Sequence, residues 1–329
     1  MNPTPFFSII VPIYNRPDEA RELLESLAAQ TDRDFELVLV EDGSTRPCAA
    51  EVEAFRSRLT IHYIVKPNTG RSDSRNVGMR ASHGAYLIFF DSDCIIPPDY
   101  FATVRRYLAT EPADCFGGPD REHPSFTPTQ KAISYAMTSF WTTGGIRGGR
   151  TNLEKFKPRT FNMGFSREVY ERVGGFKDMY GEDIDLSLRI HQAGFTTRLY
   201  RDAYVYHKRR GNLRKFFRQV HNSGIARIHL ETRHPGSTRL VHLLPAAFTV
   251  VSLLAITFGW GRCGLVALAL LWFVDALQRT RGGAEVAALS VVACFVQLWG
   301  YGSGFLRAWW GKYVQHKPEF TAFKDNFYD

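Results

Sequence analysis

The sequence predicts an α/β fold with a largely parallel sheet, followed by amphipathic interface helices and transmembrane helices. Within residues 6–110, strongly apolar strand-like stretches alternate with helical ones, a pattern typical of a parallel sheet that is covered on both faces. Further along the chain, residues 240–261 and 286–306 contain no Asp, Glu, Lys or Arg. Each run is long enough to cross a hydrocarbon core about 30 Å thick, which takes roughly 20 residues per helix.

The predicted elements follow one another in strand–helix order. Strands are expected at 6–12, 35–40, 60–65, 85–90, 159–166 and 196–207, and helices at 17–30, 51–58, 71–82 and 182–194. The first helix begins at Pro17 with acidic residues and has its leucines at helical spacing. Residues 111–165 contain glycine and proline breaks and the stretch TTGGIRGGR, which indicates either a lid over a ligand site or a surface loop.

The positive charge of the chain is concentrated in one segment. The formal net charge is +8, and residues 201–239 alone contain ten Lys or Arg against two acidic residues. A basic segment directly before apolar runs favours a cytoplasmic membrane interface, where cations meet anionic lipid headgroups, over nucleic-acid binding. The predicted units are a catalytic domain (1–210), a basic amphipathic interface segment (211–239), two or three transmembrane helices (240–309) and a tail (310–329).

The cysteines and the N-terminus indicate a reducing compartment. The five cysteines are scattered and form no CxxC pair, so neither a zinc site nor a disulfide framework is expected. The opening MNPTPFFSIIVP has no basic region before its short apolar run, and we therefore expect no signal peptide.

Three polar clusters follow three of the predicted strands. They are YNRP (14–17), EDGST (41–45) and DSDC (91–94). Ligands of parallel sheets bind beyond the carboxyl ends of the strands, so the clusters are expected to line one crevice. In the last cluster, Asp91 and Asp93 offer hard oxygen ligands for Mg²⁺ or Mn²⁺, which would hold a diphosphate. The alternative is a solvated turn that caps a helix.

The combination of motifs resembles a known enzyme family. SIIVPIYNRPDEARELLESLAAQ, FELVLVEDGST, NTGRSDSRNVGMRASHGAYLIFFDSDC and FNMGFSREVYERVGGF followed by GEDIDLSLRIHQAGF occur in one chain. They resemble the inverting family 2 glycosyltransferases, which have the Rossmann-like GT-A fold, and the resemblance covers about residues 6–207. It implies a transferase that makes a glycoside from a nucleotide-activated sugar with Mn²⁺ or Mg²⁺ as cofactor.

The resemblance also assigns roles to individual residues. Nucleotide binding is implied for Pro12, Tyr14, Asn15, Asp42, Arg75, Asn76 and Ser92. Asp91, Asp93 and His207 are the implied metal ligands, with Asp93 preferred as the direct one, although a surface histidine is the alternative for His207. Asp183 matches the base that takes a proton from the acceptor hydroxyl, and Glu182 is its alternative. For Arg75 the alternative is an arginine on a helix face.

One departure from the family concerns the segment after the catalytic domain. No QxxRW motif is present, and KFFRQVHNSGIARIHLETRHPG (215–236) takes its place. Leu213, Phe216, Phe217 and Val220 form an apolar stripe opposite basic residues, which predicts a helix lying in the membrane surface. This resembles the transferases of the succinoglycan ExoA-like group. Contact with the acceptor phosphate, or with lipid headgroups, is expected for Arg214, Arg218, Gln219 and Arg227.

These observations predict a membrane-bound transferase that adds one sugar, with a UDP-sugar as the default donor, to a polyprenyl-diphosphate-linked saccharide. Its rivals are a synthase acting on bare polyprenyl phosphate, a sugar nucleotidyltransferase and a silent membrane scaffold. The expected location is the bacterial inner membrane, with the catalytic domain in the cytoplasm. Three spans are preferred to two on length alone. The glycines of GYGSG (300–304) are expected either to allow close helix packing or to break the helix into a re-entrant segment, which would keep Lys312 and Lys317 inside.

Overall fold

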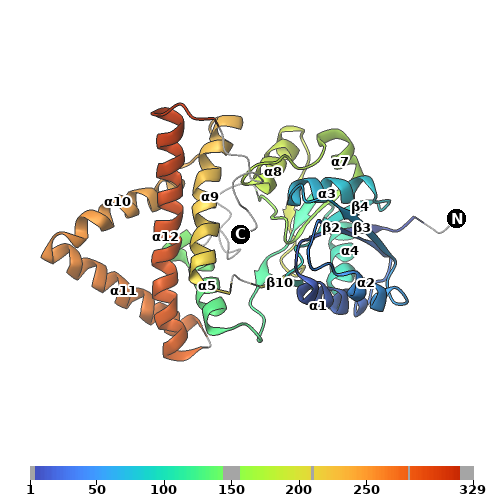
Figure 1. Ribbon diagram of the computed structural model, residues 1–329, viewed down its shortest axis with the longest axis horizontal. Helices are drawn as coiled ribbons and strands as arrows, with labels where there is room; N and C mark the ends of the chain where they lie inside the picture. Colours follow the sequence, from blue (N-terminus) through green and yellow to red (C-terminus); the bar gives the residue numbers. More distant parts are fainter. Residues whose placement is uncertain (1–3, 144–155, 209–210, 281, 319–329) are drawn as a thin grey trace.

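The N-terminal part of the molecule is built on a seven-stranded mixed sheet (Figure 1). The computed structural model describes residues 4–143, 156–208, 211–280 and 282–318. The strands lie in the order β3 (Ile61–Lys66), β2 (Phe35–Asp42), β1 (Phe7–Ile13), β4 (Tyr86–Phe89), β8 (Met163–Ser166), β6 (Cys115–Gly117) and β9 (Thr197–Leu199). Neighbouring strands are parallel except for β8, which runs antiparallel to β4 and β6. The predicted α/β architecture is confirmed.

Helices cover both faces of this sheet because successive side chains of its strands point into two different cores. Ile9 and Val11 belong to one core and Ile10 to the other, and all three are fully buried. The first core is closed by α1 (Pro17–Ala28), α2 (Ala49–Phe55) and α4 (Tyr100–Thr110). The second core is closed by α3 (Arg71–Arg80), α7 (Arg167–Val173) and α8 (Glu182–Gln192).

A small second sheet brings distant polar residues together. It consists of β5 (Cys94–Ile95), β10 (Val205–His207) and β7 (Asp120–Arg121). In the antiparallel pairing of β10 with β5, His207 lies opposite Cys94. Because Asp93 directly precedes β5, this register places His207 beside the aspartate cluster.

Two predicted strands are shorter than expected. The strand predicted over 196–207 is divided into β9, which joins the large sheet, and β10, which joins the small one. The turn between them contains Arg201 and Asp202, a polar pair that breaks the alternation of apolar residues. The strand predicted over 159–166 begins only at Met163, because Arg159 and Asn162 bridge each other across a tight turn.

A group of helices, most of them C-terminal to the sheet domain in sequence, lies beside that domain (Figure 1). Its elements are α5 (Pro128–Thr138), α6 (Phe140–Thr143), α9 (Leu213–Arg233), the 3₁₀ turn η2 (Leu240–His242), α10 (Leu244–Ile256), α11 (Gly259–Arg279) and α12 (Gly283–Tyr313). Helices α9 and α12 run side by side, and α10 and α11 form a hairpin that projects away from the sheet domain (Figure 1). The TTGGIRGGR stretch lies mostly outside the described residues, as do Arg209, Arg210 and most of the predicted tail.

The apolar stripe of α9 packs against protein. Phe216 is fully buried and Val220 is nearly so, in a core shared with α5, α11 and α12. Phe217 at the edge of the stripe is 39% exposed. The prediction that this stripe lies in the membrane surface is therefore wrong for its central residues, because α12 covers them.

Glycines make the contact between α9 and α12 possible. A Cβ atom at Gly304 would lie 2.0 Å from the carbonyl oxygen of His221, and one at Gly224 would lie 2.1 Å from that of Tyr301. Such small residues let two helix backbones approach closely. Of the two alternatives for GYGSG, close packing is the one observed, since α12 continues through it without a break.

The apolar hairpin differs from the predicted spans. Among the described helices, α11 and α12 are long and apolar enough to cross a membrane. The first apolar run forms η2 and the 13-residue helix α10, which begins beside Pro245 and ends before the turn at Phe258. At 1.5 Å per residue, α10 alone measures about 20 Å. The preference for three full-length spans is therefore not supported.

Candidate active site

A cleft of about 2160 Å³ opens at the carboxyl ends of β1, β2 and β4 and continues to α9, α10 and α12. Each of the three polar clusters contributes to its wall, as the crevice rule for parallel sheets predicts. At this end the lining includes Pro12, Tyr14, Asn15, Asp42, Arg75, Asp91, Ser92, Asp93 and His207. The structure thus brings together most of the residues for which nucleotide binding or metal binding was predicted from the sequence.

Arg75 connects two of the motifs. Its side chain is 1% exposed, and it lies 2.8 Å from Asp91 and 3.1 Å from Glu182. Arg71 approaches the other oxygen of Glu182 at 2.9 Å. Burial alone would raise the pKa of Glu182, but the charges of Arg71 and Arg75 outweigh it and lower this pKa. Glu182 is therefore an ionised carboxylate that is paired with an arginine through each of its two oxygens.

Asp93 and His207 form the part of the cleft that fits a divalent cation. His207 Nε2 lies 3.1 Å from Asp93 Oδ1 and 3.8 Å from the nearer oxygen of Asp91. Two ligand atoms at right angles, each about 2.1 Å from a cation, would lie about 3.0 Å apart. The chemistry also fits, because a carboxylate and an imidazole are suitable ligands for Mn²⁺.

A thiol lies beside these two ligands. Cys94 groups with Asp93 and His207 by distance. Burial and the neighbouring aspartates raise the pKa of Cys94 well above its ordinary value. Its Sγ lies 3.6 Å from the carbonyl oxygen of Phe161, to which it donates.

The loop after β1 is preorganised. Asn15 has a positive φ of 54°, which asparagine tolerates better than most residues. Its Oδ1 accepts hydrogen bonds from the Thr45 hydroxyl at 3.0 Å and from the Arg46 backbone N–H at 2.9 Å. These bonds fix the first polar cluster to the second.

Asp42 holds the loop after β3. It is 1% exposed, and its carboxylate accepts from the backbone N–H groups of Thr69 and Gly70, each at 3.0 Å. It also pairs with Lys66. This positioning contact was not predicted from the sequence, which assigned Asp42 only to the base or ribose.

Asp183 lies at the start of α8 and faces the cleft. Its Oδ2 is 2.8 Å from Nε of Arg159, and its side chain is 10% exposed. Glu182 also lines the cleft, but it pairs with Arg71 and Arg75, whereas Asp183 pairs with Arg159. Arg159 was not predicted from the sequence as a site residue, because its role depends on a contact that is distant in the sequence.

Two predicted site residues lie elsewhere. Asn76 does not line the cleft, because its side-chain amide accepts from the Phe176 backbone N–H and donates to the Phe176 carbonyl, both at 2.8 Å. It therefore fixes the segment after α7 to α3. Arg214 is exposed on α9 and does not reach the cleft either, whereas its neighbour Lys215 does.

The far end of the cleft combines cations with apolar side chains. Arg218, Gln219 and Arg227 of α9 line it, together with Arg239. The contact of the first three with an acceptor phosphate stays a prediction. Beyond them the lining is apolar, with Leu240, Val241, Leu243, Leu244, Phe248 and Val251. An amphiphile with an anionic head and a hydrocarbon tail matches this arrangement chemically.

The family follows from the sequence of the sheet domain. The model described as Glycosyl transferase family 2 matches residues 8–174, which are 167 of the 329 residues. The chain belongs to this family. The predicted enzyme class, a glycosyltransferase with a GT-A fold, is thereby confirmed. Membership of the ExoA-like group stays a prediction.

Individual relatives of this family 2 glycosyltransferase are distant. Validoxylamine A glucosyltransferase of Streptomyces hygroscopicus subsp. jinggangensis is 27% identical over 230 residues, which are 61% of this chain and 54% of that protein. EpsJ of Bacillus subtilis, an uncharacterized glycosyltransferase, is 26% identical over 218 residues, which are 64% of this chain and 63% of EpsJ. The chain thus spans little more than half the length of such relatives.

Solved structures show the same fold. Mannosyltransferase PcManGT from Pyrobaculum calidifontis, in complex with GDP-Man and Mn²⁺, matches with a TM-score of 0.58 and 19% identity over 91% of this chain and 88% of that one. TarS 1–349 of S. aureus in complex with UDP matches with a TM-score of 0.50 and 16% identity over 88% of this chain and 90% of that one. At these identities the likeness concerns the fold alone.

Proposed function

We propose that this chain is a divalent-metal-dependent inverting glycosyltransferase that moves one sugar from a nucleoside diphosphate sugar, a UDP-sugar by default, to a lipid-linked saccharide. The observation that carries the proposal is the single cleft in which Asp93 and His207, the carboxylate of Asp183 and the apolar residues before α10 follow one another. One cavity thereby offers a diphosphate site, a base and a place for a lipid.

The donor end is assigned to the residues that follow β1, β2 and β4. Bound there, Mn²⁺ or Mg²⁺ would neutralise the diphosphate and stabilise it as the leaving group. Asp93 and His207 would hold the ion. Tyr14 and Asn15 would border the nucleoside. Arg75 keeps Asp91 in place through its ion pair, so that the aspartate cluster retains its shape.

Asp183 is proposed as the base. The acceptor hydroxyl oxygen attacks the anomeric carbon while the bond from that carbon to the diphosphate oxygen breaks and its electron pair leaves with the nucleoside diphosphate. The hydroxyl proton passes to the carboxylate of Asp183, which Arg159 orients. Attack from the side opposite the leaving group inverts the configuration at that carbon.

The acceptor is proposed to be amphiphilic. Arg218, Arg227 and Arg239 line the cleft next to the apolar residues of η2 and α10. A lipid diphosphate would place its anionic group among these cations and its chain along the apolar wall. We expect this of a polyprenyl-diphosphate saccharide at the cytoplasmic face of a bacterial inner membrane.

The hairpin of α10 and α11 is the proposed membrane anchor. It carries large exposed apolar side chains, among them Leu253, Leu254, Phe258 and Trp260, of which Trp260 is 78% exposed. Apolar surface of this extent is typical of lipid contact. The charged end of α11 returns to the protein, because Asp275 accepts a hydrogen bond from Tyr135 of α5 at 2.6 Å.

The test is a transfer assay with purified full-length protein in detergent. UDP-, GDP- and dTDP-sugars would be offered with Mn²⁺ or Mg²⁺ to two acceptors, bare polyprenyl phosphate and a polyprenyl-diphosphate saccharide, and products resolved by mass spectrometry. We expect product from the diphosphate saccharide only. Product from the bare phosphate would establish the rival synthase activity. Release of inorganic pyrophosphate in a parallel reaction, supplied with a nucleoside triphosphate and a sugar 1-phosphate, would establish a nucleotidyltransferase.

A further inference from the structure

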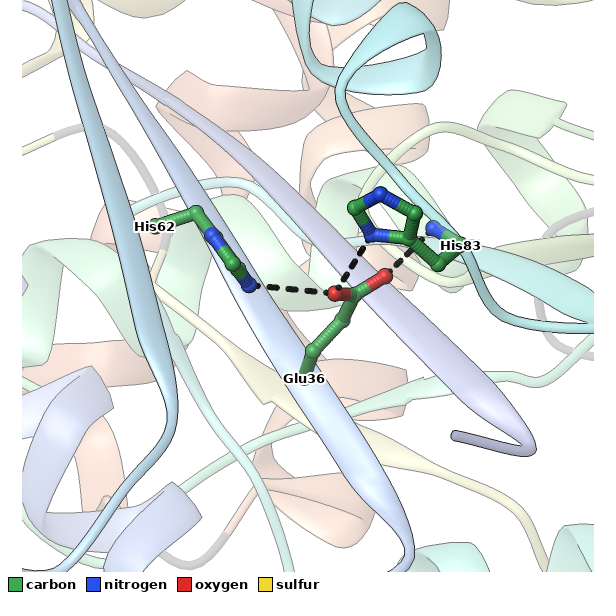
Figure 2. A group of neighbouring side chains, drawn as sticks. All are labelled: Glu36, His62 and His83. Carbon is green, nitrogen blue, oxygen red and sulfur yellow. Dashed lines mark hydrogen bonds and ion pairs between the residues drawn. The ribbon is translucent and has the colours of Figure 1, made fainter. Parts of the chain in front are cut away.

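A second cluster of metal-ligating side chains lies at the other end of the sheet. Glu36 and His62 are the second residues of β2 and β3, and His83 lies in the loop between α3 and β4. Figure 2 shows both imidazole rings directed at the carboxylate of Glu36. Because the cleft opens at the carboxyl ends of the strands and this cluster lies at their amino ends, the two sites are separate.

The ligand atoms converge on one carboxylate oxygen. Glu36 Oε2 lies 3.2 Å from His62 Nε2 and 3.1 Å from His83 Nδ1, and the three atoms all lie within 4.8 Å of one another. Ligand atoms about 2.05 Å from a tetrahedral zinc ion lie about 3.3 Å apart. The two separations between carboxylate and imidazole are close to this value, and the two imidazole nitrogens lie within 4.8 Å of each other, so a zinc ion fits once the exposed histidine side chains adjust to it.

The other carboxylate oxygen is already held in place. Oε1 of Glu36 accepts a hydrogen bond from the hydroxyl of Ser8 at 2.6 Å and another from the backbone N–H of His83. Glu36 itself is only 3% exposed. Outer hydrogen bonds of this kind orient metal-ligating carboxylates and are part of a built site. They leave Oε2 as the oxygen that faces the two imidazoles.

The loop that carries His83 is also braced. Gly84 donates its backbone N–H to the Ser8 hydroxyl at 2.7 Å, and Arg167 donates to the Gly84 carbonyl oxygen at 2.8 Å. A Cβ at Gly84 would lie 2.6 Å from the backbone nitrogen of Ser8, so the loop passes as close to β1 as a glycine allows. The positions of two of the three ligands are therefore fixed before any ion binds.

We propose that Glu36, His62 and His83 form a binding site for a transition-metal cation, Zn²⁺ in the first place. Two imidazoles and one carboxylate favour Zn²⁺ over Mg²⁺, which prefers oxygen ligands and retains its waters. The side chains of His62 and His83 are 43% and 65% exposed, so water completes the coordination. The ion links the edge strand β3 to β2 and to the α3–β4 loop, and its role is to stabilise this edge of the sheet.

The competing explanation is that protonated histidines simply pair with Glu36. It requires no ion, and it is distinguished by measuring bound metal. The experiment uses full-length protein in detergent with Asp93→Ala, which removes a ligand of the cleft site, in combination with His62→Gln, His83→Gln or both. His123→Gln is the matched control, because the ring of His123 hydrogen-bonds to Ser125 and packs against Tyr206, away from Glu36.

Each protein is stripped with chelator and dialysed against buffered free Zn²⁺, and bound zinc is measured by mass spectrometry. We expect one ion per chain with Asp93→Ala, an affinity lower by at least about tenfold after either histidine change, and no loss with the control. We also expect Zn²⁺ to raise the melting temperature of the Asp93→Ala protein only while both histidines are present. Failure of the Asp93→Ala protein to bind zinc would overturn the proposal, and this result does not depend on how well the histidine variants fold. Zinc binding that is unchanged when both His62→Gln and His83→Gln are added would also overturn it.

Discussion

Nε of Arg159 lies 2.8 Å from Oδ2 of Asp183, so an arginine from the segment before β8 orients the carboxylate that faces the cleft. The adjacent Glu182 is instead locked between Arg71 and Arg75. Neighbouring acids at the start of one helix therefore have different surroundings, so removing the charge of Asp183 should affect turnover and removing that of Glu182 should affect stability.

For Asp183→Asn we expect the turnover number to fall by about 10² to 10⁴, the range for loss of a general base, with little change in donor affinity. The asparagine keeps the shape of the side chain but cannot take up the proton. Single-turnover kinetics together with titration of the nucleotide sugar would separate the two quantities. An intact turnover number would move the role of base to another residue.

For Glu182→Gln we expect loss of stability. The change leaves Arg75, which is 1% exposed, without one of its two carboxylates, and breaking a buried pair in this way costs about 3–5 kcal/mol. Thermal unfolding in detergent measures the effect, and Glu168→Gln, at an exposed pair with Arg172, is the matched control. Equal melting temperatures for the two variants would contradict the structural role of Glu182.

For Asp93→Asn we expect loss of metal-dependent nucleotide binding and of transfer, because an amide is a much weaker ligand than a carboxylate. Asp99→Asn is the matched control, since Asp99 is exposed and its side chain makes no cap at the start of α4. Calorimetry measures the affinity of each variant for UDP, once in the presence of Mn²⁺ and once after chelation of the metal. Undiminished Mn²⁺-dependent binding in a folded Asp93→Asn protein would refute the metal assignment.

For Gly304→Ala we expect destabilisation of about 1–3 kcal/mol, because the new methyl group would lie 2.0 Å from the carbonyl oxygen of His221. Gly311→Ala in the same helix meets nothing within 4 Å. There the alanine should stabilise α12 by roughly 0.5–1 kcal/mol through its helix propensity. Melting temperatures that shift in the same direction for both variants would show that α9 and α12 are not in close contact.

For the membrane topology we expect the α10–α11 hairpin to cross, since η2 and α10 together (Leu240–Ile256) measure about 25 Å and α11 is long enough to span. The tip of the hairpin then reaches the far interface, where Arg262 meets headgroups, and the end of α12 stays cytosolic. Cys263 at this tip is exposed and Cys48, Cys94, Cys115 and Cys294 are buried, so an impermeant thiol reagent reports on the tip in intact cells.

The end of α12 is tested with Gln315→Cys in a Cys263→Ser background. Gln315 is chosen because it lies within the described residues, whereas Ala322, further along the tail, lies outside them. Protection of this cysteine until lysis is the expected result. Its labelling in intact cells would establish three spans, and protection of Cys263 would show that the hairpin does not cross.

The sheet domain could largely be predicted from the sequence because its signals are local. The alternation of apolar runs with helical spacing identifies β1 to β4 and their helices, and the polar clusters at strand ends identify the crevice. The break between β9 and β10 was missed because strand-like residues lie on both sides of the short polar pair Arg201 and Asp202. Arg159 was missed because its role depends on a contact distant in the sequence.

The helical part could be predicted less well for a different reason. An apolar helix face is compatible with lipid and with another apolar helix, since both offer hydrocarbon. The stripe that includes Phe216 and Val220 therefore does not reveal that α12 covers it. The glycines of α12 were compatible with close packing or with a break in the helix, and the sequence does not identify the partner helix.

The two ends of the continuous cleft come from different segments of the sequence, which affects how acceptor specificity can evolve within the family. Its donor end is lined by residues 12–208 and its opposite end largely by residues 215–301. Under the proposed function, the groups that recognise the acceptor are encoded together in one stretch, which follows the groups that handle the diphosphate. A lineage can thus inherit the catalytic machinery unchanged and acquire a new acceptor by mutation or recombination in one contiguous stretch.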